Sequence, residues 1–165
     1  MQAAIIARKI SPDIVECVPS ETAISIACML SNVPLFAGPS EDTLERLASF
    51  AFRRTFAKAE LIVEEGRTAN GLFIVIDGQV DIVKGRAGEQ SKVVATLGAA
   101  EPIGEMEILA EWPRTASGVA VTWTECLGMD SWVFMDYLHH EPQLAIRLAQ
   151  ILAKRLAKTS ERLAC

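Results

Sequence analysis

The sequence is poor in the residues that build metal centres, disulfide frameworks and most catalytic sites. It has two histidines and four cysteines among 165 residues, and no apolar run long enough to span a bilayer. The cysteines form no Cys-x-x-Cys pair, so we expect neither a zinc site nor a disulfide framework, and reduced thiols favour the cytoplasm. No Ser/His/Asp or Cys/His set is evident, so we predict no catalysis. The few histidines predict no metal site, and the lack of a long apolar run predicts no direct membrane insertion.

Basic charge is also scarce, except near the C-terminus. The net charge is −5 and the pI is about 5.1, which argues against a surface that binds nucleic acid without specificity. Half of the residues are apolar and 22% are charged, a balance that excludes intrinsic disorder and fits one folded domain. Residues 141–165 differ, with five Lys or Arg and two Glu. We expect this basic face to be solvated or to contact an acidic partner.

The middle of the chain, residues 50–130, has the pattern of β-structure. Short apolar runs alternate with glycine turns and little helical pattern, which favours an antiparallel barrel or jelly-roll-like sandwich over a parallel sheet. Residues 72–76 and 79–83 flank Asp77-Gly78, which predicts a hairpin. One strand is expected to bury alternate aromatic residues: Phe50, Phe52 and Phe56.

Helical patterns flank this β-region. We expect one or two helical turns within residues 3–10, and helices at residues 23–30, from residue 40, at residues 131–138 and from residue 143 to about residue 163. The last helix carries a leucine stripe beside a row of alanines. Packing against the chain's own strands explains part of this stripe, and close approach at alanine also permits a homodimer through the helix. The sequence leaves both readings open.

The segment Pro102-Ile-Gly-Glu-Met-Glu-Ile-Leu-Ala-Glu-Trp-Pro-Arg-Thr-Ala116 carries the chemistry, and we call it the cassette. Gly104 lets backbone approach a ligand closely, and a short helix starting near Glu105 directs free N–H groups toward an anion. The Arg114 guanidinium can fork onto a phosphate, while the Glu105 carboxylate can accept hydrogen bonds from hydroxyl groups. Together these groups predict a site for a sugar phosphate.

The cassette resembles the phosphate-binding cassette of the cyclic nucleotide-binding domain family. Residues 30–36 resemble the family's opening and residues 64–80 its central hairpin, so the resemblance covers about residues 30–163. It implies an α+β fold, an antiparallel eight-stranded β-roll with N-terminal helices and a long C-terminal lid helix. On this reading residues 1–29 are an N-terminal helical segment or linker, and residues 30–165 are the domain.

The resemblance also implies the ligand and its contacts. The ligand is cAMP or cGMP, and its binding moves the C-terminal helix over the base to signal to an effector domain or protein. Gly104 and Glu105 contact the ribose, and Arg114 contacts the exocyclic phosphate oxygens. Leu97 forms part of an apolar wall. Backbone amides near Met106 and Glu107 meet the cyclic phosphate, and Thr115 and Ala116 complete the cradle around it. Thr115 does not decide between cAMP and cGMP. If the basic face of the last helix is not simply solvated, one of its side chains caps the base or contacts an acidic partner; these are Arg147, Lys154, Arg155, Lys158 and Arg162.

Two residues depart from the family pattern. Ile103 replaces the usual Phe, and Glu107 stands where Ala or Ser is usual. The Glu107 carboxylate either faces solvent or lies near the phosphate, where like charges repel and weaken binding. The second case leaves an alternative function, a ligand-free β-roll that acts as a protein-interaction scaffold. Relatives of the catabolite-activator type add a helix-turn-helix after the long helix; since the sequence stops at Cys165, we expect no DNA binding.

Overall fold

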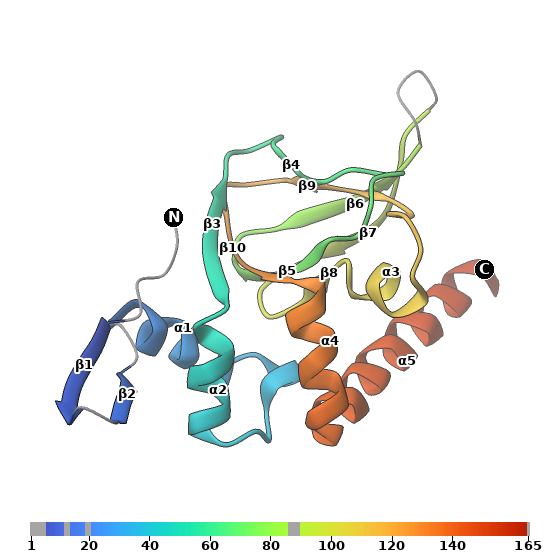
Figure 1. The fold of residues 1–165 in the computed structure, drawn as a ribbon. Coiled ribbons are helices and arrows are strands. Elements are labelled where there is room, and N and C mark those ends of the chain that lie inside the picture. The colour runs from blue at the N-terminus through green and yellow to red at the C-terminus, as the bar shows by residue number, and fades with distance from the viewer. Residues whose placement is uncertain (1–5, 12–13, 19–20, 86–89, 165) are drawn as a thin grey trace.

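The computed structural model describes residues 6–11, 14–18, 21–85 and 90–164 (Figure 1). Two antiparallel four-stranded sheets, with strand orders β3-β10-β5-β8 and β4-β9-β6-β7, face each other in a roll. This confirms the predicted α+β fold with an eight-stranded β-roll. The strands of the roll are β3 (Ala51–Phe56), β4 (Leu61–Val63), β5 (Gly71–Asp77), β6 (Val80–Lys84), β7 (Lys92–Leu97), β8 (Pro102–Ile103), β9 (Ser117–Ala120) and β10 (Thr124–Asp130).

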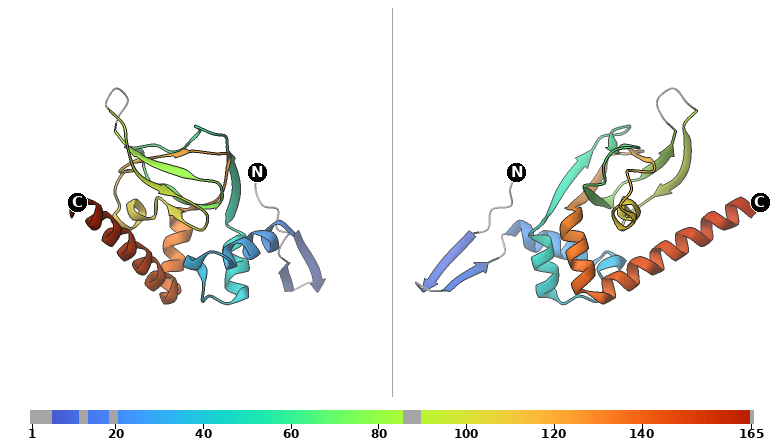
Figure 2. Two further views of the ribbon diagram at one scale, coloured as in Figure 1. Left: turned by 180° about the vertical axis from the view of Figure 1, so that it is seen from behind. Right: turned by 45° about the vertical axis from the view of Figure 1, so that its right-hand side comes forward.

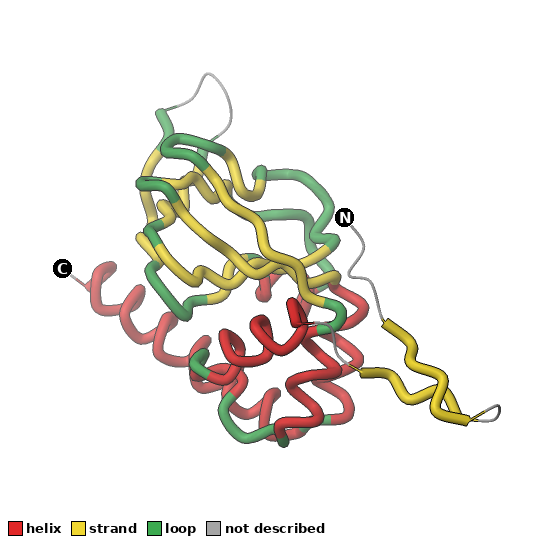
Figure 3. The backbone as a smooth tube through the Cα atoms, turned by 90° about the vertical axis from the view of Figure 1, so that its left-hand side faces the viewer, coloured by secondary structure: helices red, strands yellow, loops and turns green. Residues whose placement is uncertain are grey.

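Helices cover one end of the roll (Figure 3). They are α1 (Glu21–Ser31), the 3₁₀ turn η1 (Pro34–Phe36), α2 (Glu41–Ala48), α3 (Glu105–Ala110), α4 (Ser131–His140) and α5 (Pro142–Ala164). The helices predicted at residues 23–30, from residue 40, at residues 131–138 and from residue 143 are confirmed. Within the described residues, no helix is both long and apolar enough to cross a membrane.

The N-terminal prediction was wrong where the structure describes it. Residues 6–10, expected to form a helical turn, belong to β1 (Ile6–Ser11), which pairs in antiparallel fashion with β2 (Ile14–Val18). The hairpin projects away from the roll (Figures 1 and 3). Both strands contain β-branched Ile or Val, which favour extended backbone.

The predicted Asp77-Gly78 hairpin is also wrong. The turn exists, with Gly78 at φ 98°, but it carries the chain from one sheet to the other. Strand β5 pairs with β10 and β8, whereas β6 pairs with β7 and β9. A Cβ at Gly78 would lie 2.5 Å from the Trp123 carbonyl oxygen, so the turn needs glycine for close packing as well as for its φ.

The first strand buries fewer aromatic side chains than predicted. Phe56 is fully buried, but Phe50 and Phe52 are 50% and 42% exposed. The Phe52 ring lies over Gly128 of β10, where a Cβ would be 2.3 Å from the ring, and meets Phe73 edge-on. The Phe52 ring therefore packs against the backbone of the neighbouring strand, in the space left by the missing side chain of Gly128.

Apolar burial forms two clusters. One fills the roll and includes Val75, Val80 and Leu97. The other lies between the roll and the helices and takes in Leu144 and Leu148 from the first half of α5. The second half of α5 extends beyond this contact (Figure 2), and its Leu156 and Leu163 are 69% and 83% exposed. Only part of the predicted leucine stripe is therefore core.

Candidate functional site

A cavity of about 520 Å³ lies between strands β6 and β7, the cassette and the distal half of α5. Figure 1 shows α3 between the roll and α5, at this position. The cavity is lined by all eight side chains or backbone segments that the resemblance singled out: Leu97, Gly104, Glu105, Met106, Glu107, Arg114, Thr115 and Ala116. Ile82 of β6 and Arg155 of α5 line it too, so segments far apart in the sequence meet around one space of the size that suits a small ligand.

The Arg114 guanidinium is buried at the wall of the cavity. Its Nη1 donates a hydrogen bond to the Gly104 carbonyl at 3.0 Å, and its Nη2 donates to the Gly71 carbonyl. Burial lowers the pKa of Arg114, while the charges of Glu107 and Glu105 raise it. An arginine stays protonated under such conditions, so the group is a fixed cation with further N–H donors available for an anion.

Gly104 makes this position of Arg114 possible. Its φ is 88°, a left-handed conformation that glycine adopts freely. A Cβ built on Gly104 would lie 1.8 Å from Arg114 Nη1. The guanidinium therefore occupies the space that any other residue at position 104 would fill.

Glu105 is 1% exposed, yet its carboxylate has a cationic partner. Arg155 of α5 donates from Nη1 to Glu105 Oε1 at 2.5 Å and from Nη2 to the Pro102 carbonyl at 2.8 Å. Burial raises the pKa of Glu105 above its ordinary value of 4.5, and Arg155 acts in the opposite direction. The pair joins the cassette directly to the C-terminal helix.

Arg155 is the site residue that sequence reasoning missed. The basic face of the last helix was expected to be solvated, or to supply one side chain that caps the base or contacts an acidic partner. In the structure Arg155 contacts an acidic residue of its own chain, Glu105. Lys158 and Thr159 also line the cavity, as do Lys84 and Glu101. The only signal was the charge of the helix face, since a pairing across 50 positions of sequence leaves no local pattern.

Glu107 does not face solvent. It is 8% exposed, and its Oε1 accepts hydrogen bonds from the Thr115 hydroxyl at 2.6 Å and the Thr115 amide at 3.3 Å. Its Oε2 lies 3.8 Å from Arg114 Nη1. Of the two readings of Glu107, the structure places the carboxylate against the groups expected to hold phosphate.

The apolar wall contains Leu97, as expected, together with Val63, Ile82 and Ile103. Ile103 is 3% exposed and pairs with Phe73 of β5. Among the residues that the structure describes, no three His, Cys, Asp or Glu side chains come together as metal ligands would. The lining of the cavity thus combines apolar and charged residues, a combination that suits a flat base joined to a polar sugar phosphate.

Comparison with known proteins decides the family. The model of the family described as "Cyclic nucleotide-binding domain" matches residues 53–141, more than half of the chain. The chain belongs to the cyclic nucleotide-binding domain family. This is a family of ligand-binding regulatory domains rather than of catalysts.

Two of the relatives are named for cyclic AMP, and one of these is named as a transcriptional regulator. The chain is 32% identical over 127 residues to the cyclic AMP receptor protein of Thermus thermophilus, a match that covers 77% of this chain and 59% of the relative. It is 24% identical over 136 residues to a CRP-like cAMP-activated global transcriptional regulator of Mycobacterium tuberculosis, a match that covers 82% of this chain and 61% of the relative. The chain thus spans about three fifths of the length of these two relatives.

Solved structures of the family have the same fold. The Thermus thermophilus catabolite activator protein gives a TM-score of 0.68 at 32% identity, covering 79% of this chain and 62% of that one. A cyclic nucleotide-binding domain from Methylobacillus flagellatus gives a TM-score of 0.71 at 25% identity, covering 86% of this chain and 82% of that one.

Proposed function

We propose that this domain senses a cyclic nucleotide, without catalysis, through the cavity at the cassette. The observation that carries the proposal is the buried Arg114 guanidinium facing a cavity lined by the whole set of expected contacts. Curated relatives are named for cyclic AMP, so cAMP is the first ligand to test and cGMP the second. We assign the ribose to Gly104 and Glu105, the phosphate to Arg114 and Thr115, and the base to the wall around Leu97.

Replacing Arg114 by Ala should weaken cAMP binding by about 100-fold, because a bidentate, charge-assisted contact to the phosphate is lost. Arg114→Lys should recover only part of the affinity, since a point charge cannot fork. Titration calorimetry with cAMP and cGMP measures both effects. Lys154→Ala is the matched control because Lys154 is exposed on α5, whereas Lys158 lines the cavity. No heat from the wild-type domain with millimolar cAMP or cGMP would refute the proposal.

The proposed signal travels through α5. Glu105 is assigned both to the ribose hydroxyls and, in this structure, to Arg155 of the helix. A ligand that engages Glu105 changes what holds the distal half of α5 to the cassette. The ligand can shift the helix only by its difference in affinity for the two positions, typically worth about 1–3 kcal/mol. The output then passes to an effector domain or protein, and DNA binding has no part in the proposal.

The distal half of α5 also suits a second copy of the chain. Leu156 and Leu163 are seven residues apart, as on one face of a coiled coil, and both are exposed. We therefore expect a homodimer through α5, which Leu156→Asp should convert to monomer in sedimentation velocity runs. Lys154→Glu, a charge change on the same helix, should leave the dimer intact. A wild-type chain that sediments as a monomer at high micromolar concentration would contradict this expectation.

The cysteines are consistent with a reducing compartment, and we propose the cytoplasm. Cys28 and Cys126 are free thiols in the described part of the chain. Burial raises the pKa of Cys126 to about 12, so this thiol is unreactive at neutral pH.

A further inference from the structure

Glu107 already binds the groups that the proposed function assigns to the phosphate. One carboxylate oxygen accepts both the amide and the hydroxyl hydrogen of Thr115, and the other lies 3.8 Å from Arg114 Nη1. The Glu107 and Arg114 side chains are 10% and 6% exposed. Arg114 and Thr115 thus form a small anion site, and its present occupant is the Glu107 side chain of α3.

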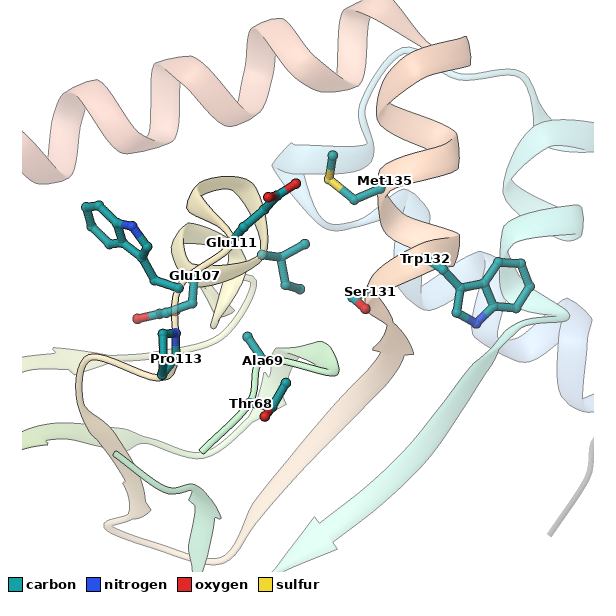
Figure 4. Close-up of a pocket in the computed structure, with 10 residues that line it drawn as sticks. Thr68, Ala69, Glu107, Glu111, Pro113, Ser131, Trp132 and Met135 are labelled. Atoms are coloured by element: carbon teal, nitrogen blue, oxygen red, sulfur yellow. The ribbon is translucent and has the colours of Figure 1, made fainter. Parts of the chain in front are cut away.

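The arrangement is specific to Glu107 among the acids of this segment. Figure 4 shows a second cavity, of about 370 Å³, between α3 and α4, and there Glu107 and Glu111 leave the α3 segment in different directions. Glu111 is exposed and does not line the larger cavity, whereas Glu107 lines both. Glu107 therefore forms part of the partition between the two spaces.

Thr115 cannot serve two anions at once. Its amide and its hydroxyl each carry a single hydrogen, and both point to Glu107 Oε1. A phosphate bound at Thr115 would also lie beside a buried carboxylate, where like charges repel strongly. Ligand and side chain are therefore alternatives at this position.

We propose that Glu107 is an internal ligand of the phosphate subsite, which a cyclic nucleotide must displace in order to bind. This inference rests on the proposed function, since it takes the same cavity as the ligand site. On this proposal, Glu107 determines how strongly the cavity discriminates between ligands with and without a negatively charged phosphate. Glu107 disfavours a ligand with a phosphate and leaves a ligand without one unaffected.

The test compares Glu107→Gln and Glu107→Ala with Glu111→Gln, which removes an equal charge from the same segment. Calorimetry with cAMP should show binding about 10- to 100-fold tighter in both Glu107 variants, since two hydrogen bonds to a charged acceptor no longer compete. Glu111→Gln should bind as the wild type does. Adenosine, which lacks the phosphate, should bind all four proteins alike.

A second probe separates this inference from the proposed function. Inorganic phosphate should shift the Thr115 amide resonance in ¹H–¹⁵N spectra of both Glu107 variants, and leave it unchanged in the wild type. If phosphate does so but no protein binds cAMP or cGMP, the inference stands and the sensor proposal fails in favour of an interaction scaffold. If phosphate leaves the Thr115 amide unmoved in both Glu107 variants, the inference is overturned. It is also overturned if the wild type binds cAMP and the Glu107 variants bind it no more tightly.

Discussion

Replacing Gly104 by alanine should lower the free energy of unfolding by about 3–4 kcal/mol and remove cyclic nucleotide binding. The left-handed backbone costs an alanine about 1–2 kcal/mol. The added Cβ, 1.8 Å from Arg114 Nη1, also breaks the hydrogen bond from this atom to the Gly104 carbonyl, and a hydrogen bond to a charged group contributes about 1.5–3 kcal/mol. Urea denaturation and calorimetry with cAMP measure the two losses.

Two other glycines separate the causes of this effect. Gly66 has φ 83° and nothing within 4 Å of the place where a Cβ would lie, so Gly66→Ala measures the backbone cost alone, about 1 kcal/mol. Gly98 has open space and no positive φ, so Gly98→Ala should be close to neutral. If Gly104→Ala is no more destabilising than Gly66→Ala, the close approach of Arg114 to the backbone is not a constraint on the fold.

Replacing Arg155 by alanine should lower the free energy of unfolding by about 3 kcal/mol at pH 8, because it leaves the buried Glu105 carboxylate without its cation. The deficit should shrink on acidification. Loss of Arg155 raises the pKa of Glu105 further, and a carboxyl whose pKa is raised by folding contributes most stability below its unfolded pKa. That contribution is lost as the pH rises through the folded pKa, so the variant approaches the wild type only toward pH 4.5.

Urea denaturation between pH 4.5 and pH 8 provides the measurement. Lys154→Ala, the neighbouring cation on α5, should change stability little at any of these pH values, since Lys154 is exposed. Adding Glu105→Gln to Arg155→Ala removes the stranded charge and should recover most of the loss at pH 8. A deficit that is independent of pH would show that Arg155 stabilises the protein by packing and by its bond to the Pro102 carbonyl.

Much of the fold could be predicted because short-range patterns determine it. Ser40 accepts a hydrogen bond from the Thr43 amide at the start of α2, and Pro142 begins α5 where proline is tolerated. The failures lie where the pairing partner is distant. Asp77-Gly78 specifies a turn but not which sheet the next strand joins, and Phe52 is placed by a glycine on β10.

In the candidate site, too, contacts within one short segment could be predicted and contacts between distant segments could not. The cassette could be assigned because its contacts come from one continuous segment with recognisable spacing. Whether Glu107 is exposed could not be predicted, because it depends on how the loop after α3 brings Thr115 back to the helix. The contact of Arg155 with Glu105 could not be predicted either, because the two residues are 50 positions apart and the basic residues around Arg155 are exposed.

The unequal attachment of α5 makes it a lever. Its 23 residues span about 34 Å, with the near end fixed by Leu144 and Leu148 and the distal half held to the cassette through Arg155. A tilt of about 10° about Leu148, the last of these core residues, would move Arg155 by about 2 Å and the far end by about 4 Å, taking 1.5 Å of length per residue. A displacement at Glu105 too small to disturb the roll is therefore enlarged at the tip of the helix, where a neighbouring molecule could detect it.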